Sequence, residues 1–220
     1  MSIRKKYFVE LEEINQKLLL MQKKVISAIQ ESINALLNKD SLLIEDTFRK
    51  EKEIDSLERD IEQECLKILL MEHPVAGDFR EVSAALKMIT DLERIGDQSA
   101  DIAELILEMK EMDSFLMIGH IQDMAKIATK MVKESLDAFH QHDLNHALEV
   151  KKMDIKMDEL FDQVKKDIIQ MIKESNDKGD LTINFLMIAK YFERIGDHVV
   201  NICEWIEFNQ TGKLNNTRLI

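Results

Sequence analysis

The sequence predicts an all-α protein built from two tandem three-helix bundles, and three observations lead to this prediction. The 220 residues include only 6 glycines and 1 proline, and aromatic residues make up 5 % of the chain. Most β-sandwiches and barrels are excluded, because they need a turn about every 8–12 residues. Apolar residues recur at intervals of three and four over long segments, which indicates amphipathic helices. One pentapeptide also occurs twice, 100 residues apart, which indicates an internal duplication.

The first half of the chain shows three helical stripes of apolar residues. The stripe over 8–36 predicts one long first helix, and the polar residues 38–41 interrupt it. A second stripe covers 54–68 and ends before the only proline. Asp78 is then expected to cap a third helix, whose apolar residues lie within 82–106.

The same pattern starts again in the second half. Helices are predicted over about 115–139, 144–174 and 180–208, and the pentapeptide Glu-Arg-Ile-Gly-Asp at 93–97 returns at 193–197. A three-helix unit is therefore duplicated. The predicted boundaries are 1–112 for the first bundle, 113–210 for the second and 211–220 for a C-terminal tail.

Charge and composition exclude several classes of function. The chain carries 30 Lys and Arg against 42 Asp and Glu, a net charge of −12 with neutral histidines. Nucleic acid is not expected as a partner, because its phosphates are bound by clustered basic residues. There is no apolar run of the roughly 18 residues that a membrane helix needs and no signal-like core, so a cytoplasmic protein is expected. Cys65 and Cys203 lie on apolar stripes and are interpreted as core residues.

Pairs of acidic residues at i and i+4 stand out on four helices. Such residues project from one face of a helix about 6 Å apart. If helices two and three form an antiparallel hairpin, their two pairs lie level, since both cross-pairings average to position 74. In the second unit both cross-pairings average to 175.5. The pairs are Glu51 with Asp55, Glu93 with Asp97, Asp154 with Asp158, and Glu193 with Asp197.

If the pairs of each unit share one side of their hairpin, at least four carboxylates gather there. Each like-charge contact at about 6 Å costs roughly 2–3 kcal/mol at a dielectric near 20. Such a cluster needs a cation, protons or arginine neighbours, and carboxylates suit Fe³⁺, Mn²⁺ or Mg²⁺, with Zn²⁺ as a further candidate. The alternative is a solvated acidic face with ordinary ion pairs from Arg94 to Asp97 and from Arg194 to Asp197.

At these residues the sequence resembles the PhoU family of phosphate-transport regulators, over roughly 5–210. The residues that carry the resemblance are Glu-Arg-Ile-Gly-Asp at 93–97, Glu-Arg-Ile-Gly-Asp-His at 193–198, Asn-Ile-Cys-Glu at 201–204, His73-Pro74 and Asp78-Phe79-Arg80. The resemblance implies paired three-helix bundles whose acidic motifs hold multinuclear iron or zinc at the surface. The implied ligands are Glu51, Asp55, Glu93, Asp97, Asp101, Asp154, Asp158, Glu193 and Asp197, with Asn201 as a weaker ligand in place of a carboxylate.

The resemblance also implies a role and partners. Members of the family restrain phosphate uptake and the phosphate-starvation response by contacting the ATPase subunit of an ABC-type phosphate transporter and a sensor histidine kinase. A homodimer is expected, which would reach the membrane only through these partners. Which transporter or kinase is served stays open, as do the metal and the face that binds partners.

Two other classes of protein remain as alternatives. A metal-free helical scaffold would use the acidic faces only for solubility. A carboxylate-bridged di-iron enzyme is disfavoured, because Gly96 and Gly196 occupy the positions where Glu-x-x-His motifs need histidine, so no enzyme is expected. These two glycines are instead predicted to allow close approach of a neighbouring helix.

Smaller motifs have structural readings. His142 and His146, with His140 nearby, have the spacing of a zinc pair but are expected to lie in a solvated turn. Trp205 and Phe208 form either a core contact or an edge for a partner.

Overall fold

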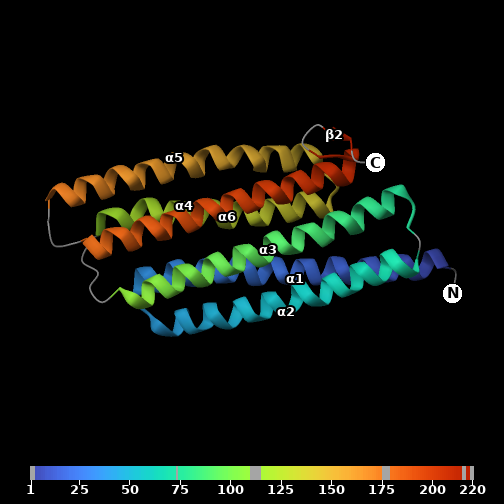
Figure 1. Ribbon diagram of the computed structural model, residues 1–220, viewed down its shortest axis with the longest axis horizontal. Helices are drawn as coiled ribbons and strands as arrows, with labels where there is room; N and C mark the ends of the chain where they lie inside the picture. The colour runs from blue at the N-terminus through green and yellow to red at the C-terminus, as the bar shows by residue number, and fades with distance from the viewer. Residues whose placement is uncertain (1–2, 73, 110–114, 175–178, 215–216, 219–220) are drawn as a thin grey trace.

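The computed structural model describes residues 3–72, 74–109, 115–174, 179–214 and 217–218, and six long helices contain nearly all of them (Figure 1). The helices are α1 (Ile3–Asn38), α2 (Ser41–Met71), α3 (Ala76–Glu108), α4 (Phe115–His140), α5 (Leu144–Glu174) and α6 (Gly179–Thr211). The predicted all-α fold with two three-helix repeats is confirmed. Two short antiparallel strands, β1 (Lys213–Leu214) and β2 (Thr217–Arg218), follow α6, where the sequence predicted only a tail.

Helix boundaries follow local sequence signals, with one correction. Asp40 caps α2 as a polar residue should, since its carboxylate accepts a hydrogen bond from the Leu42 backbone N–H at 2.9 Å. The prediction that Asp78 caps α3 is wrong. The extended Val75 is the N-cap without a side-chain bond, and the helix begins at Ala76, so Asp78 lies in its first turn. A carboxylate there still interacts favourably with the helix dipole. His73, part of the predicted turn, lies outside the described residues.

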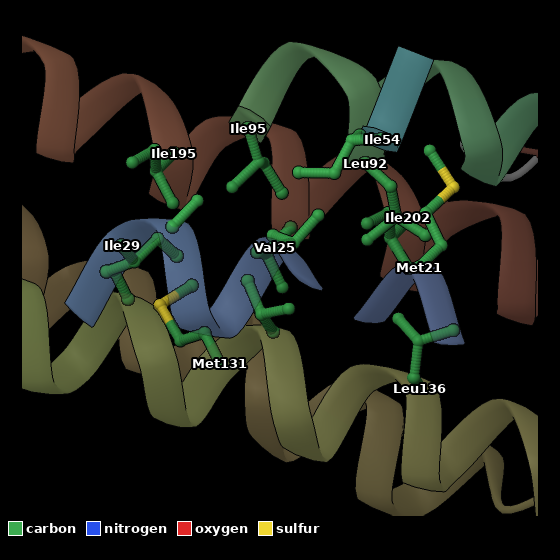
Figure 2. Close-up of a cluster of buried hydrophobic side chains, with 14 of the residues drawn as sticks. Met21, Val25, Ile29, Ile54, Leu92, Ile95, Met131, Leu136, Ile195 and Ile202 are labelled. Atoms are coloured by element: carbon green, nitrogen blue, oxygen red, sulfur yellow. The ribbon is translucent and has the colours of Figure 1, made fainter. Parts of the chain in front are cut away.

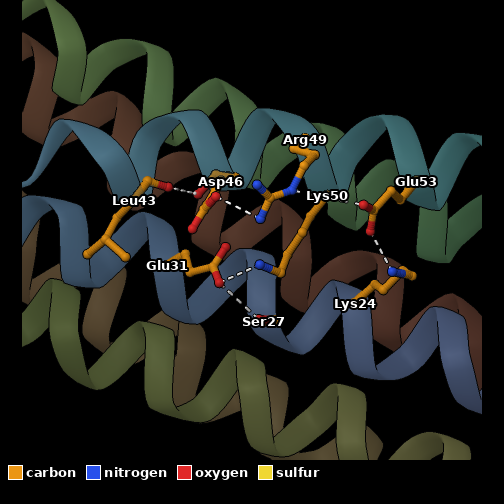
Figure 3. Close-up of polar contacts among 9 residues, drawn as sticks. Lys24, Ser27, Glu31, Leu43, Asp46, Arg49, Lys50 and Glu53 are labelled. Atoms are coloured by element: carbon orange, nitrogen blue, oxygen red, sulfur yellow. Dashed lines mark hydrogen bonds and ion pairs between the residues drawn. The ribbon is translucent and has the colours of Figure 1, made fainter.

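Opposite charges join α1 to α2 along their length. Lys24 pairs with Glu53 and Lys50 pairs with Glu31, both at 2.5 Å, as Figure 3 shows. Nearer the other end of the hairpin, Lys17 lies 2.8 Å from Glu64. Opposite charges therefore face each other along the contact between α1 and α2. The contact between α2 and α3 differs, because acidic residues face one another there.

The two repeats share one hydrophobic core. Helices α3 and α6 run antiparallel beside each other at the centre of the molecule, with α2 and α5 on the outside (Figure 1). Figure 2 shows side chains from both repeats in one cluster, among them Val25 of α1, Ile95 of α3, Met131 of α4 and Ile195 of α6. The repeats are thus joined mainly by buried apolar surface.

Residues predicted as core side chains occupy the core. Cys65 and Cys203 are buried and free, and burial raises the pKa of each thiol to about 12. Phe208 is buried, and Trp205 packs against the core with its ring centroid 5.6 Å from that of Phe208. Among the described residues, no helix has a segment that is both long enough and apolar enough to cross a membrane.

Candidate metal centre

In the first repeat, the carboxylates of α2 and α3 meet as predicted. Glu51 and Asp55 of α2 and Asp97 of α3 each offer an oxygen, and these three atoms lie within 4.8 Å of one another. The three side chains are partly buried. The level pairing across the hairpin is therefore confirmed in this repeat, and three oxygen ligands converge on a volume that one cation can occupy.

The pKa values of Glu51 and Glu93 are raised, in part because neighbouring carboxylates repel their charge. Burial, and after it the neighbouring Asp97, Glu58 and Asp55, together raise the pKa of Glu93 to about 7. The pKa of Glu51 is also raised, first by burial and then by Asp55 and Asp97. Each shift means that the negative charge is unfavourable where the fold places it. A bound cation would remove this cost.

Arginines compensate part of this charge. Arg94 lies 3.4 Å from Glu93 and 3.4 Å from Asp97, and Arg59 lies 3.7 Å from Asp55. Both arginines are more than half exposed, so water screens these pairs. The predicted ion pair from Arg94 to Asp97 is confirmed, yet the pKa of Asp97 stays raised, first because of burial. The arginines therefore neutralise only part of the negative charge of the cluster.

Asp101 extends the row of α3 toward the second repeat. Its pKa is raised, first by burial and then by Asp97 and Glu104, and Arg194 of α6 opposes the shift. Arg194, which the sequence pairs with Asp197, thus acts on a carboxylate of the other repeat.

In the second repeat, Asp154 of α5 and Glu193 of α6 are partly buried, whereas Asp158 and Asp197 are exposed. Burial, and after it the charges of Asp158, Asp197 and Glu193, together raise the pKa of Asp154 to about 6. Among the described residues its buried Oδ1 has no hydrogen-bond partner. A buried oxygen without a donor is costly, and a cation would satisfy it. The four predicted carboxylates of this repeat therefore act on one another electrostatically.

The glycines of the repeated pentapeptide create the space for these helix contacts. A Cβ atom on Gly196 would lie 2.6 Å from the Oδ1 of Asp154, and one on Gly96 would lie 3.0 Å from the Cδ1 of Ile54. The predicted close approach of a neighbouring helix is confirmed at both positions. In the second repeat the contact is with a candidate ligand itself.

The two candidate sites differ in the basic side chains that lie beside them. Lys190 pairs with Glu193 at 2.5 Å and lies with Lys165 over the ring of Phe161, at 5.5 and 4.8 Å from its centroid. The corresponding positions of the first repeat hold Thr90, Glu62 and Glu58. Within the described part of the chain, only the first repeat brings three candidate ligand atoms within 4.8 Å. The second site is thus the weaker candidate.

Asn201 follows Asp197 by one turn of α6 and also contacts the first repeat. Its Nδ2 donates to the Oδ1 of Asp91 on α3 at 3.2 Å, and the Nδ1 of His198 lies 2.9 Å from the same oxygen. Asn201 therefore joins the contact between the two repeats through its amide nitrogen. Sequence spacing alone could not reveal this contact, because it depends on how α3 and α6 pack.

One acidic residue that the sequence analysis left out belongs to the first site. Burial raises the pKa of Glu58, whose side chain also forms a hydrogen bond with Thr90. Glu58 follows Asp55 by three residues, so helical spacing could have identified it. The histidines after α4 diverge, with His142 3.3 Å from Gln210 and His146 3.6 Å from Glu134, which agrees with a turn rather than a zinc pair.

Comparisons with known proteins identify the family. The PhoU domain model matches residues 18–106 and 121–206. The protein named phosphate-specific transport system accessory protein PhoU homolog of Clostridium acetobutylicum is 33 % identical over 211 residues, 96 % of each chain. The protein of the same name from Borreliella burgdorferi is 34 % identical over 220 residues, 97 % of this chain and 99 % of that protein.

Solved structures agree with this match along the whole fold. The crystal structure of PhoU from Pseudomonas aeruginosa superposes with a TM-score of 0.89 at 30 % identity, covering 94 % of this chain and all of that one. The phosphate transport system regulatory protein PhoU from Streptococcus pneumoniae gives a TM-score of 0.87 at 28 % identity. Two matched domains, relatives along nearly the full length and the same fold lead to one conclusion: the chain belongs to the PhoU family.

Proposed function

We propose that this protein is an accessory protein of a phosphate-specific transport system, which restrains phosphate uptake and the phosphate-starvation response. The observation that carries the proposal is the similarity, over 96 % of both chains, to a protein named for that accessory role. The expectation that the chain is not an enzyme is confirmed, since its relatives are named as accessory and regulatory proteins.

The protein acts by contact with other proteins. Its partners are the ATPase subunit of an ABC-type phosphate transporter and a sensor histidine kinase, and it works as a cytoplasmic homodimer that reaches the membrane through them. An accessory protein of a transport system must touch a component of that system, or the sensor that controls it, to change its activity. This reasoning supports the proposal, together with the names of the relatives.

The acidic rows bind metal ions in this proposal. The ligands in the first repeat are Glu51, Asp55, Glu93, Asp97 and Asp101, and those in the second are Asp154, Asp158, Glu193 and Asp197. Two observations support the fit: the three convergent oxygens of the first repeat and the unpartnered Oδ1 of Asp154. An all-oxygen ligand set favours hard cations, so iron(III), manganese and magnesium suit it better than zinc.

Metal analysis tests this part directly. Protein purified without an affinity tag is assayed by mass spectrometry for iron, zinc, manganese and magnesium, before and after chelation. We expect bound metal that chelation removes. When metal is returned, the protein should unfold at a higher temperature, because binding adds RT ln(1 + [L]/Kd) to the free energy of unfolding. Absence of metal and of any stabilisation would favour a metal-free scaffold, for which Arg94, Arg59 and Lys190 already provide partial charge compensation.

Deletion of the gene tests the regulatory role. In phosphate-rich medium the deletion strain should express its phosphate-scavenging genes, because their restraint is lost, and a wild-type copy should restore repression. Unchanged expression in the deletion strain would contradict the proposed role.

A further inference from the structure

A pocket of about 280 Å³ lies between the second half of α1 and the first half of α4. Figure 2 shows the neighbouring part of this contact, where Ile29 of α1 faces Met131 of α4. Two buried residues that line the pocket, Ile33 and Ala125, are apolar. The other lining residues are partly or fully exposed, and they are Gln30, Asn34, Leu37, Gln122, Lys126 and Thr129. No candidate metal ligand lines the pocket, so it is separate from the acidic rows.

The internal duplication relates the two helices that form this pocket. The Ser32 hydroxyl of α1 donates to the Ile29 backbone oxygen at 2.9 Å. In α4 the Ser135 hydroxyl donates to the Val132 backbone oxygen at 3.1 Å. The two serines are 103 residues apart. At the same separation, the buried residues at 18, 21, 25, 28 and 36 correspond to buried residues at 121, 124, 128, 131 and 139. Residues of α1 can therefore be matched with those of α4 one by one.

This match shows why the pocket is open. Gln22 is 5 % exposed, and its Nε2 donates to the backbone oxygens of Val132 at 3.4 Å and Lys133 at 2.9 Å. The residue of α4 that corresponds to Gln22 is Ala125, and the residues of α1 that correspond to its two acceptors are 29–30. A carbonyl oxygen in a helix keeps a second lone pair for such a bond. Ala125 has no donor to offer, so the second contact lacks the amide that the first one has.

The side chains around the pocket favour a neutral ligand. Three of them are the carboxamides of Gln30, Asn34 and Gln122, and each can donate and accept hydrogen bonds. Among the described lining residues only Lys126 is charged, and it lies 2.8 Å from the carboxylate of Asp123. A charged ligand would therefore meet no uncompensated opposite charge here, whereas a carboxamide can pair with a carboxamide.

We propose that this pocket binds a small neutral molecule that carries a primary carboxamide on an apolar body. Its NH₂ group replaces the missing amide and donates to the backbone oxygens of 29–30, its oxygen accepts from Gln122 or Asn34, and its apolar body covers Ile33 and Ala125. At about 30 Å³ for each water-sized group, the pocket holds about nine non-hydrogen atoms, the size of benzamide. Because α1 and α4 belong to different repeats, the bound molecule bridges the two repeats.

Titration of the isotope-labelled full chain with benzamide, followed by two-dimensional NMR, tests the proposal. We expect the side-chain NH₂ signals of Gln30 and Gln122 to shift, with a Kd in the millimolar range, because so small a ligand has few contacts. N,N-dimethylbenzamide keeps the ring and the carbonyl but has no N–H donor, so it should bind about tenfold more weakly. Benzoate, which replaces the amide by a charged carboxylate, should also bind about tenfold more weakly.

Substitutions locate the binding. Ala125→Gln gives α4 the glutamine that α1 has at the corresponding position, so it should fill the pocket and abolish the shifts. Lys130→Gln is the matched control, because it places the same side chain on an exposed position of α4 outside the lining, and it should bind benzamide like the wild type. Asn34→Leu with Gln122→Leu keeps similar side-chain sizes without two of the carboxamides, and it should weaken binding about tenfold.

Three outcomes would overturn the proposal. Unchanged shifts in folded Ala125→Gln would mean that benzamide binds elsewhere. Equal affinity for N,N-dimethylbenzamide would mean that the NH₂ group is not recognised, and tighter binding of benzoate would mean that Lys126 selects an anion instead. Circular dichroism checks that the variants are folded. If Ala125→Gln does not fold, the double leucine variant decides, and wild-type affinity in that variant contradicts the proposal.

Discussion

At the level of single residues, the fold places carboxylates where their charge is unfavourable. Between α1 and α2, acidic residues face lysines, as Glu31 faces Lys50. Between α2 and α3 they face one another, and the pKa of Glu93 rises to about 7. A chain optimised only for stability would use the first arrangement in both places. The second arrangement indicates a function that needs the uncompensated charge.

The pKa of Glu93 predicts how the metal-free protein responds to pH. Its folded-state pKa of about 7 exceeds the ordinary 4.5, so the folded chain holds this proton more tightly than the unfolded chain. This contribution to stability is present below pH 4.5 and is lost as the pH rises through about 7. Glu93→Gln removes the charge. It should raise the melting temperature at pH 8 by about 2–4 °C, the shift for about 1 kcal/mol in a domain of this size, and change it little at pH 5.

Thermal unfolding at both pH values, in the presence of chelator, measures this effect. Asp60→Asn is the control, since Asp60 is exposed on α2 and lies outside the cluster. It should give the same small change at pH 5 and pH 8. An equal effect of Glu93→Gln at the two pH values would mean that the charge of Glu93 is not the source of the stabilisation.

At the level of helices, periodicity predicted the elements well but not the details that depend on packing. The fifth helix has the predicted bounds, and the sixth extends from Gly179 to Thr211 instead of 180–208. The acidic pairs could be matched across each hairpin by counting residues from its turn, because residues at equal distance from the turn lie side by side in antiparallel helices. The hydrogen bond from Asn201 to Asp91 could not be predicted, since Asp91 belongs to the other repeat. Counting along one hairpin carries no information about the neighbouring one.

The mid-helix glycines give a prediction about packing. Gly96→Leu should lower the melting temperature, because even its Cβ would lie 3.0 Å from the Ile54 side chain and the larger side chain would separate α2 from α3. Gly119→Ala is the control, since nothing lies within 4 Å of the added Cβ. It should stabilise α4 by up to about 1 kcal/mol through helix propensity alone. An unchanged melting temperature for Gly96→Leu would show that the close contact is absent.

The contact of Gly196 with Asp154 links helix packing to ligand position. A Cβ at this position would lie 2.6 Å from the Asp154 Oδ1, so Gly196→Ala must move that carboxylate. If the second repeat binds metal, Gly196→Ala should lose the metal of the second site and keep the metal of the first site. Metal content per chain, measured after dialysis, reports the loss. Gly96→Ala meets Ile54 rather than a ligand and should retain both sites; equal metal content in the two variants would contradict this account.

At the level of the whole molecule, the shared core makes the two repeats one folding unit. Side chains of both repeats pack in the cluster of Figure 2, and the bond from Asn201 to Asp91 adds a polar link between α3 and α6. The packing of α3 against α6 is therefore part of the stability of each repeat. A duplicated sequence alone is equally compatible with two independent bundles, so this property had to come from the structure.

One transition should therefore describe unfolding. The only tryptophan, Trp205, lies in the second repeat, whereas helical circular dichroism reports on both. In urea, tryptophan fluorescence and circular dichroism should give the same midpoint, because the repeats unfold together. Separate midpoints would show that each bundle is stable alone and that the shared core contributes little.

The last prediction asks whether metal is needed for regulation. Asp97→Ala with Asp197→Ala should abolish metal binding while keeping the helical content, because removing two charges from repelling clusters relieves strain in the metal-free fold. In a strain that lacks the gene, we expect this variant to restore repression of phosphate-scavenging genes only partly. The rest of the helical surface is unchanged in this variant, so we expect contact with partners to be weakened rather than lost. Asp123→Ala with Glu149→Ala, which changes exposed acids on other helices, should restore repression fully. Full repression by the metal-free variant would reduce metal to a structural accessory, and the helical surface alone would then carry the regulatory function.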